Sequence, residues 1–177
     1  FSLVVETDAN TTTYTDSGLT NGTTYYYVVT SVYDDGAIES AYSNVASATP
    51  MSTVTLSVGS GEAMSGDVVI IAVGMSNVEP VAGVQFDLVD TPDYLTLVSA
   101  VGVGRVPTDW SVSVSDVDGQ GLLLGFSFSG TTIAPGEGAT FELTFSTAAT
   151  EPSNVSVCIE NETVSDADGG AFMTETG

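Results

Sequence analysis

The fold of this chain is decided by the stretch Val81-Ala82-Gly83-Val84-Gln85-Phe86-Asp87-Leu88. From Val84 onward, large apolar residues alternate with polar ones. Because successive side chains of a β-strand point to opposite faces, this pattern predicts a strand with one buried face and one solvent-facing face. We expect Phe86 in a core and Gln85 and Asp87 on the outside.

Short alternating segments of the same kind recur along the chain, at the roughly ten-residue spacing that is typical of β-sandwiches. Turn residues (Gly, Asp, Asn, Ser and Thr) separate them, and no window of a dozen residues shows an apolar period of 3.6. The clearest further examples are 53–58 and 141–145, while 68–73 and 122–128 are short, nearly continuous apolar runs that also fit strands. The fold class predicted from these patterns is all-β. Phe141, Leu143 and Phe145 should face inward.

The charge balance excludes several classes of function. The 177 residues include 23 acidic side chains, a single basic one (Arg105) and no histidine. Nucleic acid binding requires a basic surface, and an anionic membrane surface would repel this chain. Without histidine, general acid–base catalysis and Ser-His or Cys-His nucleophiles lose their usual base, so we expect no enzyme. The longest apolar run, 68–73, is too short for membrane insertion.

A segment boundary is predicted at Ala48-Thr49-Pro50-Met51-Ser52, because proline cannot donate to a strand ladder and a new strand pattern begins at Thr53. The chain thus divides into 1–50 and 51–177. Fifty residues are about half of what an immunoglobulin-like sandwich contains.

The first segment carries a leucine, an Asn-Gly turn and a tyrosine in the order Leu19, Asn21-Gly22, Tyr25. This order resembles the tyrosine corner of fibronectin type III modules. The resemblance implies that Tyr25 has a buried ring and a hydroxyl bonded to nearby backbone, with Tyr27 and Val29 on the same face. A turn at 34–36 would lead to a closing strand in 40–48.

By the same resemblance, residues 1–6 are similar to strand C′ and residues 11–16 to strand E. Strands A, B and C of such a module have no counterpart in 1–50. A half-sandwich leaves apolar faces and strand edges open. We therefore expect the missing strands either upstream in a longer polypeptide or in another chain.

The second segment contains several motifs in a fixed order: Ser65-Gly66-Asp67, the stretch 81–88, Thr91-Pro92-Asp93-Tyr94-Leu95, and Ile133-Ala134-Pro135-Gly136-Glu137-Gly138 before 141–145. This order resembles cohesin domains and the related carbohydrate-binding-module-like sandwiches. The resemblance implies a jelly-roll β-sandwich that binds a protein partner, the dockerin module, through one sheet face.

In cohesins the binding surface uses polar and acidic residues of strands that match 82–89 and 110–128 here. Carried over by position, the candidate partner contacts are Gln85, Asp87, Ser113, Ser115, Asp116 and Asp118. The alternative interpretation is that these side chains are an ordinary solvated outer face.

Two acidic turns raise the question of calcium, a cation that prefers oxygen ligands. Residues 116–119 and 166–169 both read Asp-x-Asp-Gly, like the start of a calcium loop, but the later ligand positions of such a loop are missing. Asp-Gly is also a hairpin-turn signal. A partial calcium site at Asp166 and Asp168 is the alternative to a plain turn. No cofactor other than calcium is expected.

Two single residues carry separate expectations. Trp110, the only tryptophan, is expected either as an exposed contact aromatic or as a half-buried residue that closes one end of the sandwich. Cys158, the only cysteine, has no partner for an internal disulfide, and we expect it to pack as a small core residue.

The sequence thus predicts a non-catalytic binding and display module of a secreted or surface-anchored, extracellular protein, with cohesin-like protein recognition. Its expected partner is a dockerin-like module or a neighbouring subunit. One alternative is a structural subunit of an extracellular filament or surface layer, a homo-oligomer assembled by strand complementation. A second alternative is a carbohydrate-binding module.

Overall fold

A computed structural model describes residues 1–33, 38–148 and 154–177. Throughout these residues the secondary structure is strand and turn, which confirms the all-β prediction. In the same ranges no helix is long and apolar enough to cross a membrane. The chain divides into two compact units, Phe1–Met51 and Ser52–Gly177, which are described separately. The turn expected at 34–36 lies outside the described residues.

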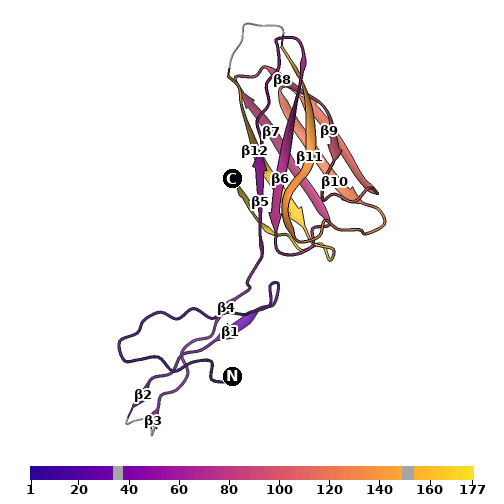
Figure 1. Cartoon of the computed structure of the whole chain (residues 1–177). Helices are drawn as coiled ribbons and strands as arrows, with labels where there is room; N and C mark the ends of the chain where they lie inside the picture. Colours follow the sequence, from indigo (N-terminus) through magenta and orange to yellow (C-terminus); the bar gives the residue numbers. More distant parts are fainter. Residues whose placement is uncertain (34–37, 149–153) are drawn as a thin grey trace. The chain divides into compact units, whose positions relative to one another are not determined.

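The second unit is a sandwich of two sheets (Figure 1). The five-stranded sheet has the order β13 (Met173–Thr176), β5 (Thr53–Val58), β6 (Val68–Asn77), β11 (Gly136–Thr147), β8 (Leu95–Gly102). The four-stranded sheet has the order β12 (Ser156–Ser165), β7 (Gly83–Thr91), β10 (Gln120–Ser127), β9 (Trp110–Val117). All neighbours are antiparallel except β13 and β5, which are parallel.

The core lies between the two sheets and is formed by the inward positions of each strand. Phe86 of β7 and Phe141 of β11 are both fully buried, with ring centroids 6.3 Å apart in an edge-to-face arrangement. As the alternation predicts, their strand neighbours at inward positions are buried as well: Val84, Leu88, Leu143 and Phe145. Gln85 and Glu142 lie on the opposite, exposed faces.

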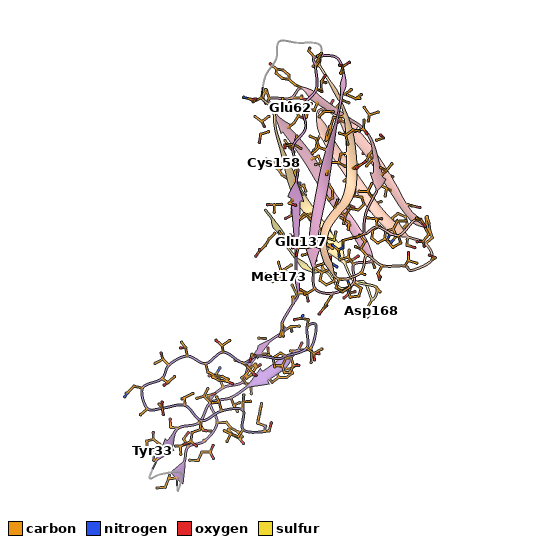
Figure 2. The ribbon with its side chains drawn as sticks, viewed as in Figure 1. Tyr33, Glu62, Glu137, Cys158, Asp168 and Met173 are labelled. Atoms are coloured by element: carbon orange, nitrogen blue, oxygen red, sulfur yellow. The ribbon has the colours of Figure 1, made fainter. Side chains whose placement is uncertain are left out.

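Trp110 and Cys158 both differ from expectation. Trp110 is buried, at 9% exposure, and its Nε1 donates to the carbonyl of Thr131 at 3.0 Å, so the ring belongs to the core. Cys158 is exposed on β12 (Figure 2), and the prediction of a core position is wrong. The reason is register: Val157 and Ile159 on either side of it turn inward, so the thiol faces out.

Arg105, the only basic residue, fastens one end of the sandwich. Its guanidinium donates to the carbonyl of Met75 at 2.9 Å, to Oδ1 of Asn77 at 2.7 Å and to the carbonyl of Ala134. The guanidinium thus donates hydrogen bonds both to the end of β6 and to the loop before β11, and it holds these two segments together. Gly136 has a φ of +146° and passes so close that a Cβ would lie 3.4 Å from the guanidinium.

In the first unit, the described residues 1–33 and 38–51 form two short strand pairs. β1 (Tyr25–Tyr27) pairs with β4 (Ala46–Ala48), and β2 (Val32–Tyr33) pairs with β3 (Ile38–Glu39). Residues 1–24 form no strand, so the strands expected at 1–6 and 11–16 are wrong. A strand needs a neighbour to pair its backbone groups, and residues 1–51 provide none for these segments.

Tyr25 behaves in part as the resemblance to a tyrosine corner implies. Its hydroxyl accepts a hydrogen bond from the backbone N–H of Thr20 at 2.9 Å, but its ring is half-buried rather than buried. Val29 was expected on the same face and instead is 71% exposed, because β1 ends at Tyr27 and the alternation stops there. No described residue of 1–51 is buried.

The packing predicts which substitutions weaken the second unit. Phe86→Ala and Phe141→Ala should each lower the free energy of unfolding by about 3–5 kcal/mol, because each leaves a cavity between the sheets. Gln85→Ala, on the exposed face of the same strand as Phe86, is the matched control and should be nearly neutral. Chemical denaturation measures all three. Equal small effects for the three variants would contradict this assignment of faces.

The burial pattern also predicts unequal stability of the two units. Residues 1–51 should exchange their backbone amide hydrogens much faster than residues 52–177, since no core protects them from local opening. Hydrogen–deuterium exchange read by mass spectrometry on the whole chain distinguishes the two. Slow exchange at 25–29 in a monomer would show that this segment is stabilised by contacts with the rest of the chain.

A candidate docking face on the four-stranded sheet

The outward side chains of β12, β7, β10 and β9 form one continuous surface, which we call the docking face. Two rows of it follow from the strand register. In the first row, Thr163, Gln85, Leu124 and Ser113 lie opposite one another across the four strands, and in the second row Glu160, Asp87, Leu122 and Ser115 do so. Four of the predicted contact residues are therefore neighbours on one face, in two adjacent rows.

The other two predicted contacts lie elsewhere. Asp116 turns inward: its Oδ2 accepts a hydrogen bond from the backbone N–H of Leu97 at 2.7 Å and so links β9 to β8 of the opposite sheet. Asp118 and Gly119 are the two-residue turn between β9 and β10, with φ values of 55° and 78°. Positive φ at both positions identifies the hairpin turn that Asp-Gly favours, so this part of the sequence interpretation is confirmed.

The centre of the docking face is apolar, which sequence reasoning missed. Leu122, Leu124 and Phe126 of β10 are half-buried and point outward, while Gly121, Leu123 and Gly125 point inward. Glycine suits these positions, because a Cβ at Gly125 would lie 3.3 Å from the ring of Phe141, and one at Gly121 would lie 3.0 Å from Leu97, both tight contacts. Glycine at alternate positions of an apolar run was the signal that the large side chains face out.

Asp87 is held in place at the edge of this apolar centre. It accepts hydrogen bonds on Oδ2 from Asn161 Nδ2 at 2.8 Å and Gln120 Nε2 at 3.2 Å. Asn161 has a φ of 51° and lies in a β-bulge, where the register of β12 against β7 shifts between Glu160 and Thr163. The bulge thus aims an amide at the carboxylate and fixes its orientation.

At one end of the docking face lies a loop whose side chains donate hydrogen bonds to Asp109. Its carboxylate accepts hydrogen bonds from Ser127 Oγ at 3.0 Å, from Thr131 Oγ1 at 2.8 Å and from Ser129 Oγ. The Ser129 and Thr131 hydroxyls, in that order, lower the pKa of Asp109 because they stabilise its charged form. The lowered pKa means that the Asp109 carboxylate stays charged, and keeps accepting these bonds, to a lower pH than an ordinary aspartate.

The two residues predicted as a calcium site lie in the loop between β12 and β13, where Figure 2 labels Asp168. Oδ1 of Asp166 already accepts two backbone hydrogen bonds, from Asp168 at 2.9 Å and from Gly170 at 2.7 Å. In the described parts of the chain no three His, Cys, Asp or Glu side chains form a group that could hold a metal. This geometry favours the turn, and the calcium site stays a prediction.

Comparisons with known proteins fit this architecture. No protein-family model and no curated protein matches the sequence. Among solved structures, the sixth cohesin of scaffoldin B from Acetivibrio cellulolyticus, solved in complex with a Cel5 dockerin, has a TM-score of 0.59 at 17% identity. The match covers 71% of this chain and 94% of that cohesin.

Two further matches come from other organisms. A non-cellulosomal cohesin from the archaeon Archaeoglobus fulgidus has a TM-score of 0.56 at 20% identity, over 70% of this chain and 86% of its own. A Clostridium thermocellum cohesin, solved in the Coh-OlpA–Doc918 complex, has a TM-score of 0.59 at 16% identity, over 70% and 94%. The second unit has the cohesin fold.

The turn around Asp166 yields a prediction that separates its two interpretations. Asp166→Ala should destabilise the second unit by about 1–2 kcal/mol, because two backbone N–H groups lose a charged acceptor. The loss should be the same with calcium as with a chelator if the carboxylate only orders the turn. Thermal unfolding in both buffers measures it, with Asp168→Ala as the neighbouring control. A loss confined to the calcium buffer would instead support the calcium site.

Proposed function

We propose that the second unit is a non-catalytic protein-recognition module that binds a dockerin-type partner on the docking face. The observation that carries this proposal is the apolar ridge of Leu122, Leu124 and Phe126, which lies on the outside of the sheet between polar strands. Solvated outer faces normally place polar residues at such positions. An apolar centre with a polar rim is the usual anatomy of a protein interface.

The geometry of the face supports a partner of stated size and charge. From Leu122 to Phe126 the ridge extends about 13 Å, at roughly 3.3 Å per residue, which is the length of about nine residues of helix. Gln85, Ser113 and Ser115 beside the ridge offer hydrogen bonds that would fix the register of the partner. Because the only cation of the chain, Arg105, is committed to the end of β6, a complementary partner brings the positive charge for Asp87 and Glu160.

Two of the structural neighbours support the type of partner. The Acetivibrio cellulolyticus and Clostridium thermocellum cohesins were both solved in complex with dockerins. We infer the same class of partner for this chain, in an extracellular setting. The absence of histidine from the whole sequence and the commitment of Asp109, Asp116 and Asp166 to hydrogen bonds within the fold support a binding role over a catalytic one.

A second function, assembly by strand complementation, is favoured by one observation on the first unit. Its described residues include thirteen large apolar side chains that are exposed, among them Phe1, Tyr26 and Tyr42, each at 60% or more. Such surfaces and the open edges of short strand pairs accept added strands. This would make the first unit a connection within a filament or surface layer, while the second unit displays the docking face.

Binding to dockerin modules tests the main proposal. Leu124→Asp, in the middle of the ridge, should weaken binding at least tenfold to whichever module of a panel binds the chain, the Cel5 and Doc918 dockerins included. The matched control is Ile70→Asp, since Ile70 is 57% exposed on β6 of the other sheet. Isothermal titration calorimetry measures both. Equal losses from the two variants, or no binding to any module, would contradict the proposal.

A further inference from the structure

We propose that Phe128 is the aromatic anchor of the docking face, inserting between apolar side chains of a partner helix; the inference rests on the proposed function. Phe128 is 85% exposed, the highest value among the large apolar side chains of the described residues. It follows β10 directly and lies at the Phe126 end of the ridge. Within the second unit its ring contacts that of Phe126, yet most of it stays exposed to solvent.

The ring of Phe128 nevertheless packs against a neighbouring ring. Its centroid lies 4.7 Å from that of Phe126, at an interplanar angle of 73°. Edge-to-face contact of this kind is a favoured geometry for aromatic pairs. A side chain that is already oriented before binding loses little conformational entropy on association, which is the advantage of rigid aromatic anchors in paratopes.

The backbone on either side of Phe128 is held by hydrogen bonds. Ser127 Oγ donates to Asp109 and accepts from the backbone N–H groups of Ser129 at 3.1 Å and Thr131 at 3.3 Å. The Thr131 carbonyl in turn accepts from Nε1 of the buried Trp110. Asp109 is therefore a positioning residue: it acts on the partner only through the loop that presents Phe128.

The surroundings make the aromatic pair protrude. Phe126 lies opposite Gly83 on β7 and Ser111 on β9, and Ser165 of β12 lies opposite Gly83. A row of small residues around two rings leaves a raised step at the end of the ridge. Such a step fits a pocket in a partner rather than a flat surface.

The occupant follows from what the docking face offers. A sheet face presents side chains, with its backbone groups paired within the sheet, so a partner must pack side chains against it rather than add a strand. A helix with an apolar stripe covers a straight ridge of this length. Asp87 and Glu160 beside the ridge favour lysine or arginine on the flanks of that helix. We therefore assign the face to a basic amphipathic helix of a partner protein.

The test uses a phage-displayed library of amphipathic helical peptides, selected on the whole 177-residue chain and depleted on the Leu124→Asp variant so that only binders of the docking face remain. The expected pool is rich in lysine and arginine. Phe128→Ala should weaken binding of individual peptides at least tenfold. Met64→Ala, which removes a side chain 79% exposed in the loop before β6, should leave binding unchanged. The melting temperature should be the same for both variants.

A double-mutant cycle separates positioning by Asp109 from a general structural effect. If Asp109 acts through Phe128, then Asp109→Ala weakens binding in the wild-type background and has little further effect in the Phe128→Ala background. Additive losses would overturn the positioning role. Peptides that bind wild type and Phe128→Ala equally well would contradict the role of Phe128 as an anchor, but not the proposed binding role of the docking face. A selection that yields no peptide dependent on Leu124 would overturn the anchor together with the proposed function.

Discussion

Phe86 and Phe141 meet edge to face at the centre of the sandwich, with neither ring exposed to solvent. Phe141 projects from β11 of the five-stranded sheet towards β10 of the four-stranded sheet, and its ring lies so close to Gly125 that a Cβ there would be only 3.3 Å away. The inward positions of β10 are therefore small on either side of Leu123. The other large side chains of β10 lie on its outer side and form the ridge of the docking face.

This arrangement connects the stability of the sandwich with the recognition role that we propose for its outer face. In an ordinary half-exposed strand, the large apolar side chains pack inward and the polar ones face water. In β10 the core is filled from the opposite sheet, so leucine and phenylalanine at outward positions are not needed to bury the interior. Their exposed apolar surface is unfavourable in the folded monomer. Burial of that surface in a complex would be favourable.

The strong negative charge of the chain is distributed in a way that suits this role. Several acids serve the fold directly: Asp90 accepts hydrogen bonds from the backbone N–H groups of Tyr94 and Leu95, Asp109 gathers three hydroxyls, and Asp116 bridges to β8. The single arginine is likewise used for structure. The docking face thus keeps only a few carboxylates beside an apolar centre, which allows close contact with an uncharged or basic surface.

The sequence by itself determined the all-β class, the inward and outward assignments of β7 and β11 and the Asp-Gly hairpin, because a period of two and a turn signal are local properties of the chain. The candidate contacts Gln85, Asp87, Ser113 and Ser115 came from the resemblance to cohesins, and strand register places these four side chains on one face. Only the tertiary structure decided the rest. The inward side chain of Asp116, the burial of Trp110 and the exposure of Cys158 depend on register between strands. Residues 1–24 form no strand, because strands require partners that local pattern cannot supply. The glycines at 121 and 125 indicated the outward direction of Leu122 and Leu124, but only the strand register and the packing of Gly125 against the ring of Phe141 decide it.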